Sequence, residues 1–236
     1  MLGGRPSARS FGAAAAEYER GRPGYPREAI DWLLPAGAQR VLDLGAGTGK
    51  LTRDLHARGL ETVAVEPSRL MREEFRRALP AVVPIAGTAE DIPLADASVD
   101  AVLVAQAWHW VDVSRAVPEV ARVLRPRGTL GLVWNLRDDR VDWVADLGPI
   151  LHADDQQDLR SAAPAVGPLF GPVARADFAW QHQVTPAELV DLAASRSYVI
   201  TRPAARRAAL LRSVRELLTN HPALAGAMSI SMPYIA

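Results

Sequence analysis

The residues most able to do chemistry lie in one short stretch near the start of the chain. An apolar run containing Asp43 is followed by Gly45, Gly47 and Gly49 at alternate positions, and a helix-like pattern comes next. Glycine adopts positive φ and lets a ligand approach the backbone closely. A strand that ends in such a turn and leads into a helix is typical of nucleotide-type binding sites in open α/β sheets. The stretch therefore predicts a binding site for a nucleotide-like cofactor.

Apolar runs alternate with amphipathic stretches from residue 40 to residue 134, and these elements must position the glycine turn. Near-continuous apolar strands separated by amphipathic helices predict a parallel sheet covered on both faces. Right-handed crossovers make such an α/β sheet doubly wound, with its ligand cleft at the carboxyl ends of the strands. We expect strands at residues 40–44, 61–65, 81–86, 99–104 and 129–134.

The regular alternation lapses after residue 136. Residues 176–184 and 228–234 alternate in hydrophobicity, which predicts two further strands. Thr185 and Glu188 form a capping box that predicts the start of a helix. Other helices are expected at residues 13–20, 28–34, 147–159 and 204–218.

Three segments are expected from this organisation. Residues 1–35 form an N-terminal arm, to which a resemblance given below adds the role of a lid over the cofactor, and residues 36–136 form a Rossmann-like cofactor-binding core. Residues 137–236 contribute a small helical cap and the last two strands of the same sheet. The predicted fold is thus a doubly wound, seven-stranded, mostly parallel α/β sheet with a helical cap.

The composition of the 236 residues fits an ordinary globular protein, with 49% hydrophobic and 23% charged residues. Basic and acidic side chains balance at 27 each without a basic tract, which argues against nucleic-acid binding. The absence of Cys excludes disulfides and thiolate sites, and the five His have no ligand-like spacing, so we expect no metal. No apolar run suggests a signal peptide or a membrane span, so a cytoplasmic monomer or homodimer is expected.

The spacing of the glycines decides between cofactors. A dinucleotide fingerprint needs its third glycine one position beyond Gly49, where Lys50 stands, and the P-loop pattern is absent. Instead, residues 41–49 resemble motif I of the class I S-adenosylmethionine-dependent methyltransferases. Three further stretches resemble later motifs of that family in the same order, and they lie at residues 63–68, 87–100 and 122–130.

The resemblance implies a role for several residues in binding S-adenosylmethionine, with S-adenosylhomocysteine as the product. Asp43 would lie near the methionyl end, and Glu66 would accept both ribose hydroxyls, a bidentate contact that needs a carboxylate. Met71 would pack beneath the adenine, and Ala89 with Glu90 or Thr88 would contact its edge. The implied cofactor-binding residues are Tyr18, Arg22, Asp43, Gly45, Ala46, Gly47, Gly49, Glu66, Pro67, Met71, Ala89, Glu90 and Gln106.

The loop after the fourth predicted strand, Gln106-Ala107-Trp108-His109-Trp110, would lie beside the cleft. Carbonyls and aromatic faces suit a cationic sulfonium, although the Trp side chains could simply cover the sheet edge. His109 is a candidate catalytic base because its ordinary pKa is near neutral. A structural hydrogen-bonding role for His109 is the open alternative.

A narrower resemblance adds candidates for binding the methyl acceptor. The arm and the loop are similar to a small-molecule subgroup that includes trans-aconitate methyltransferases, in which the arm folds over the cofactor. This implies that Tyr18, Arg22 and Tyr25 belong to a lid, with Arg22 toward the cofactor carboxylate. The candidate substrate-binding residues are Tyr25, Trp108, Arg196 and Tyr198.

The sequence therefore predicts a methyltransferase acting on a small organic molecule, with O-methylation of a carboxylate or hydroxyl the best-supported reaction. Two alternatives stay open. One is a catalytically silent protein that still binds S-adenosylmethionine, and the other is a nicotinamide oxidoreductase. The nicotinamide alternative is the weaker, because of the early Gly49 and the motif at residues 87–94.

Overall fold

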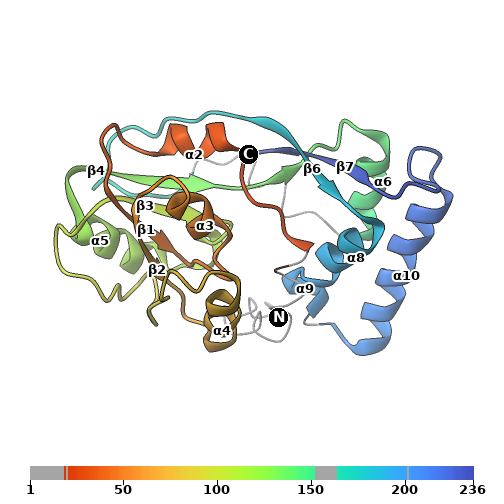
Figure 1. Ribbon diagram of the computed structural model, residues 1–236, viewed down its shortest axis with the longest axis horizontal. Coiled ribbons are helices and arrows are strands. Elements are labelled where there is room, and N and C mark those ends of the chain that lie inside the picture. Colours follow the sequence, from red (N-terminus) through yellow and green to blue (C-terminus); the bar gives the residue numbers. More distant parts are fainter. Residues whose placement is uncertain (1–18, 20, 152–163, 201) are drawn as a thin grey trace. The chain divides into compact units, whose positions relative to one another are not determined.

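The computed structural model describes Glu19 and residues 21–151, 164–200 and 202–236 (Figure 1). The chain divides into two compact units. The core unit holds the described residues within 24–134 and 163–178 together with Ala236. The C-terminal unit holds those within 1–23, 135–162 and 179–235. Apart from Glu19, the helix predicted at 13–20 lies outside the described residues.

The core unit is built on a parallel sheet of four strands in the order β2-β1-β3-β4. The strands are β1 (Arg40–Leu44), β2 (Glu61–Val65), β3 (Val99–Ala105) and β4 (Leu124–Val133). The chain passes from β1 to β2 on one side and then crosses back to place β3 on the other side of β1. Ligands of such sheets bind outside the carboxyl end of the strand where the order reverses. That strand is β1, and the glycine turn follows it directly.

Helices cover both faces of this sheet, as the apolar strand pattern predicts. Val41 and Leu103 point to one face and pack with α2 (Arg27–Leu33) and α3 (Lys50–His56). Leu42 and Val102, one residue along, point to the other face and pack with α5 (Val113–Val123). This period of two places apolar side chains on both faces, so the central parts of the strands are buried, whereas Glu61 of β2 and residues 125–127 of β4 are exposed.

The remaining helix of the core unit, α4 (Arg69–Ala78), begins after Ser68, whose hydroxyl accepts a hydrogen bond from the Met71 N–H at 3.4 Å. Asp112 caps α5 in the same way, because its carboxylate accepts from the Ser114 N–H at 3.0 Å. Such caps satisfy N–H groups that have no partner inside the helix. The predicted cap at Asp112 is confirmed. A short 3₁₀ helix, η2 (Trp108–Trp110), precedes α5.

The strand predicted at residues 81–86 is not a strand in the structure. Only an isolated bridge between Val65 and Ile85 continues the ladder beside β2. Pro84 precedes the bridging residue, and proline has no N–H to donate to a ladder. The segment therefore borders β2 without extending the sheet by a full strand.

The expected single sheet of seven strands is also not what the structure describes. The last strands, β5 (Leu136–Arg137), β6 (Ala179–Val184) and β7 (Ile230–Ile235), form a separate antiparallel sheet in the order β5-β7-β6. β7 pairs with β5 on one edge and with β6 on the other, so its hydrogen-bonding edges are both occupied within this small sheet. The fold is therefore a Rossmann-like α/β fold with a four-stranded parallel sheet and a three-stranded antiparallel one.

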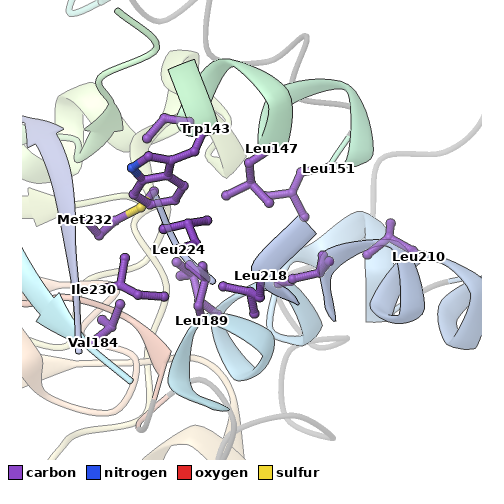
Figure 2. Packing of buried hydrophobic residues seen from close by; sticks show 14 of the residues in the cluster. Trp143, Leu147, Leu151, Val184, Leu189, Leu210, Leu218, Leu224, Ile230 and Met232 are labelled. Atoms are coloured by element: carbon purple, nitrogen blue, oxygen red, sulfur yellow. The ribbon is translucent and has the colours of Figure 1, made fainter. Parts of the chain in front are cut away.

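The C-terminal unit packs its helices and its small sheet around a core of its own (Figure 2). Among its described residues, the helices are α6 (Asp142–Ile150), α8 (Pro186–Ala194), α9 (Ser197–Ile200) and α10 (Ala204–Asn220). The predicted capping box is present, because Thr185 and Glu188 bond to each other's backbone N–H groups. Figure 2 shows Trp143, Leu189 and Met232 from different elements converging in this core. Over the described residues, no helix is both long and apolar enough to cross a membrane.

Candidate functional site

The glycine turn is held against the end of β2 by backbone hydrogen bonds. The N–H groups of Gly45 and Ala46 both donate to the Val65 carbonyl, at 2.8 and 3.1 Å. Gly45, Gly47 and Gly49 have φ angles of +76°, +56° and +89°, a region that strains residues with a side chain. The turn therefore depends on glycine at all three positions.

Gly49 has a second reason to lack a side chain. It is the residue before α3, and a Cβ there would come within 2.7 Å of the Phe75 ring of α4. The third glycine thus allows close packing of α3 against α4. Direct contact of Gly49 with a cofactor stays a prediction.

Glu66, at the end of β2, is 6% exposed and clamps the turn from the side. Its Oε2 accepts from the Gly47 N–H at 2.9 Å, and its Oε1 accepts from the Ser68 N–H at 2.8 Å. Burial raises the pKa of Glu66, while these two bonds and the charge of Arg72 oppose the rise. A carboxylate offers about four acceptor positions. Two therefore remain on Glu66 for the hydroxyl groups of a ligand.

Asp43 is the second buried acid beside the turn, and it is 1% exposed. Its Oδ2 accepts from the Thr52 hydroxyl of α3 at 2.5 Å, whereas its Oδ1 is buried without a hydrogen-bond partner. Desolvation raises the pKa of Asp43 to about 7, and the nearby charges of Glu66 and Asp54 add to the rise. An unpartnered buried acceptor at the carboxyl end of β1 suits a ligand that brings a hydrogen-bond donor or a positive charge.

The residues predicted to hold an adenine ring occupy two different packing environments. Met71 of α4 is 3% exposed, and Pro67 before that helix is half-buried. Ala89 is buried among residues that pack with α5. The carboxylate of Glu90 accepts from the Asp112 N–H at 2.8 Å, so Glu90 also helps to fix the start of α5. Contacts of these residues with adenine stay predictions.

Gln106 follows β3 and has a φ of +58°, which is uncommon for a residue other than glycine. Its N–H donates to the Val133 carbonyl at 2.9 Å, which holds it at the edge of the sheet. Backbone strain of this kind tends to occur at functional sites. The sequence pattern contains no signal for this strain.

Trp108, a candidate for substrate contact, lies inside the core unit. It is 4% exposed, packs with residues of α5, and donates its indole N–H to the Ala165 carbonyl at 3.2 Å. Both its ring and its polar atom are thus engaged by the protein. This placement favours a packing role, and contact with a substrate stays a prediction.

His109 is exposed, and its Nδ1 accepts a long hydrogen bond of 3.4 Å from the indole N–H of Trp134. Its ring also lies 4.7 Å from that of Trp110. A neutral imidazole that accepts at Nδ1 carries its proton on Nε2. The hydrogen bond from Trp134 gives His109 a structural contact, and its role as a base stays a prediction.

The arm residues predicted to act together fall in different units. Arg22 belongs to the C-terminal unit, where it donates to Ser195 Oγ at 3.1 Å and to the Ser195 carbonyl at 3.4 Å. Tyr25 belongs to the core unit and packs beside α2, and its backbone N–H bonds to the Asp54 carboxylate. Tyr18 lies outside the described residues.

Among the acceptor-site candidates, Arg196 is half-buried in the C-terminal unit and its Nε has no hydrogen-bond partner. Tyr198 lies in α9, and its side chain is not part of the described structure. Sequence reasoning missed Thr52 and Arg72. Thr52 is a polar residue at the start of an otherwise apolar helix face, and this pattern could have indicated it.

The structure is that of an α/β protein with a candidate site for a nucleotide-type cofactor at the carboxyl end of β1. Comparison with known proteins narrows this class. The family described as "Methyltransferase domain" matches residues 42–132. An uncharacterized methyltransferase of Mycobacterium tuberculosis is 58% identical over 231 residues, covering 98% of this chain and 94% of the relative. An uncharacterized methyltransferase-like protein of Schizosaccharomyces pombe is 35% identical, covering 96% of this chain and 92% of its own length.

Among solved structures, a candidate type II methyltransferase of Anaeromyxobacter dehalogenans has a TM-score of 0.65 at 24% identity, covering 91% of this chain and 94% of its own. That likeness supports the fold alone. The chain belongs to the class I S-adenosylmethionine-dependent methyltransferases. The relatives do not favour a nicotinamide oxidoreductase.

Proposed function

We propose that this protein transfers a methyl group from S-adenosylmethionine to an oxygen atom of a small organic molecule, either a carboxylate or a hydroxyl. The observation that carries the proposal is the pair of buried acids, Asp43 and Glu66, at the ends of neighbouring strands beside the glycine turn. The unpartnered Oδ1 of Asp43 and the spare acceptor positions of Glu66 fit a ligand rich in hydrogen-bond donors.

The two buried acids would contact different parts of the cofactor. Glu66 would accept the ribose hydroxyls while its backbone bonds keep the turn in place. Asp43 would orient donors at the methionyl end, including the amino group. Met71 and Ala89 would supply apolar contact to adenine because both are buried, and Gln106 would border the reacting group from the end of β3.

Bound S-adenosylmethionine supplies a methyl group that its sulfonium has already activated: the C–S bond breaks as an acceptor oxygen forms the C–O bond. The protein's task is to align the acceptor and exclude water. An acceptor that is already anionic needs no base, whereas an alcohol does. The engagement of His109 Nδ1 by Trp134 therefore favours a carboxylate over a hydroxyl.

The resemblance of the arm and loop extends the proposal to the small-molecule subgroup that includes trans-aconitate methyltransferases. The best-supported competitor is a protein that binds the cofactor without turning it over. Methyl transfer from labelled S-adenosylmethionine to a panel of small organic molecules separates the two. Transfer to any of them excludes the silent alternative.

Calorimetry tests the cofactor site directly. S-adenosylmethionine and S-adenosylhomocysteine should bind, and NAD should not. Glu66→Ala should weaken binding of S-adenosylhomocysteine by about 1.5–3 kcal/mol, as for a hydrogen bond to a charged group.

The matched control for that variant is Glu28→Ala, which removes an exposed acid from α2 of the same unit. The affinity of this control variant for S-adenosylhomocysteine should equal that of the wild type. Melting temperatures of both variants show whether Glu66→Ala also loosens the turn. Equal affinity of the Glu66 and Glu28 variants would refute the ribose role, and failure of both S-adenosyl compounds to bind would refute the proposed function.

A further inference from the structure

Tyr234 of β7 is a buried polar residue that the cofactor site does not use. It is 1% exposed, and its hydroxyl has no hydrogen-bond partner. The Trp180 ring of β6 stacks on it at 5.6 Å, and that indole N–H donates to Asn135. A buried hydroxyl without a partner destabilises a fold, and phenylalanine would pack equally well in an all-apolar place. The hydroxyl therefore needs an explanation beyond packing.

Positive charge gathers around this phenol from three parts of the C-terminal unit. Arg137 of β5 lies directly opposite Tyr234 in the ladder and is only 2% exposed. Residues opposite each other in a ladder share one face of the sheet. Burial raises the pKa of Tyr234, while the charges of Arg196, Arg137 and Arg22 oppose that rise. The charges of all three arginines thus act on the phenol, and Arg137 is its direct neighbour across the ladder.

The end of α8 holds two of these arginines in place. Arg22 donates to the side chain and the carbonyl of Ser195, the residue that follows the helix. Gly21 makes this approach possible, because a Cβ there would lie 2.3 Å from the Leu192 backbone nitrogen. Arg196 comes next to Ser195, and its buried Nε has no partner. A helix C-terminus attracts cations, but this explains Arg22 and not the unsatisfied Nε of Arg196.

We propose that Tyr234, Arg196 and Arg137, with Arg22 beside them, form a binding site for an oxoanion, which is the acidic group of the methyl acceptor. Guanidinium groups and a phenol present donors, and arginine has no acceptor. A carboxylate or phosphate oxygen would satisfy both the Tyr234 hydroxyl and the Arg196 Nε. The site lies wholly within the C-terminal unit. Only its assignment to the acceptor rests on the proposed function.

Thermal unfolding of the full chain tests the site without any cofactor. Sodium succinate and sodium phosphate are compared with sodium chloride at equal ionic strength. At least one of the two oxoanions should raise the melting temperature more than chloride does. In Tyr234→Phe, the same stabilisation should need about tenfold more anion, since one hydrogen bond to a charged group is lost.

Tyr234→Phe is informative because it should fold at least as well as the wild type, having lost only an unsatisfied hydroxyl. Arg196→Gln is the second test variant and should also weaken the response. Arg206→Gln removes an exposed charge from α10 of the same unit and should respond like the wild type. An absent oxoanion response, or an unchanged response in both test variants, overturns the site.

Two further measurements separate this proposal from the proposed function. If saturating S-adenosylhomocysteine leaves the oxoanion response intact, the site does not hold the cofactor's own carboxylate, which supports its assignment to the acceptor. If it abolishes the response, the arginines hold the cofactor's own carboxylate, and the assignment to the acceptor is wrong. If S-adenosylhomocysteine does not bind while the oxoanion does, the proposed function fails and the oxoanion site stands.

Discussion

Asp43→Asn offers a test of the buried acid beside the glycine turn. The pKa of Asp43 is raised from 3.8 to about 7, chiefly by desolvation. The folded protein therefore keeps a proton that the unfolded chain releases as the pH rises above about 4. The shift corresponds to about 4 kcal/mol of unfolding free energy. This contribution is complete below about pH 4 and is lost as the pH rises to about 7.

Asparagine is nearly isosteric and carries no titrating group, so the variant lacks this pH dependence. Its carbonyl can still accept the hydrogen bond from Thr52. Urea unfolding of both proteins from pH 4 to pH 8 measures the effect. The free energy of unfolding of the wild type should fall relative to that of the variant by about 4 kcal/mol across this range. The comparison uses only the change in free energy of unfolding with pH, so a pH-independent effect of the new amide on stability does not alter the result.

Asp100→Asn is the matched control in the same unit. Hydrogen bonds from the Arg40 and Gln39 N–H groups and from Arg125 lower the pKa of Asp100 to about 2. Its stabilising contribution is therefore present above about pH 4 and disappears only at more acidic pH. The difference in free energy of unfolding between the wild type and this control should therefore stay nearly constant from pH 4 to pH 8. If the free energy of unfolding changed with pH in the same way for the wild type and Asp43→Asn, the raised pKa of Asp43 would be refuted.

Two other substitutions test the turn and the loop. Gly49→Ala should destabilise the protein by about 2–4 kcal/mol in urea unfolding, because it combines a left-handed φ with overpacking against Phe75. The control is Gly148→Ala, whose Cβ would meet no atom outside its own helix within 4 Å, and it should not lower the free energy of unfolding. An equal effect of the two substitutions would contradict the packing argument. His109→Ala should slow methyl transfer by less than tenfold, because Trp134 already occupies Nδ1; a loss of about a hundredfold would establish a general base instead.

The core of the fold could be predicted because its signals are local. The apolar strand runs, the glycine turn and the cap at Asp112 each lie within a few neighbouring residues, and the structure confirms them. Strand pairing is less local. The run at residues 81–86 has the composition of a strand, but Pro84 limits it to one bridge. The pairing of β7 with both β5 and β6 depends on segments far apart in the chain, which no sequence pattern records.

The candidate site divides in the same way. Glu66 could be singled out because it ends a strand in a stretch that resembles a family motif; the structure places it against the glycine turn, and its contact with ribose stays a prediction. The bonds from Arg22 to Ser195 join residues 173 positions apart, so the sequence around Arg22 contains no signal for them, and the predicted grouping of Arg22 with Tyr25 stays a prediction. The unsatisfied atoms of Asp43 and Tyr234 are also invisible in the sequence, because satisfaction depends on every neighbour at once.

Both acids beside the turn cost the protein stability, and this cost bears on function. Burial raises the pKa of Asp43 and of Glu66, so each is held in an environment that disfavours its charged form. The charged forms become favourable again when a ligand supplies donors or positive charge. A protein that only needed a stable core could place neutral residues at both positions. Two desolvated carboxyl groups at the switch point of the sheet therefore support the proposed role of both acids in binding a ligand, since acids with perturbed pKa values are typical of binding sites.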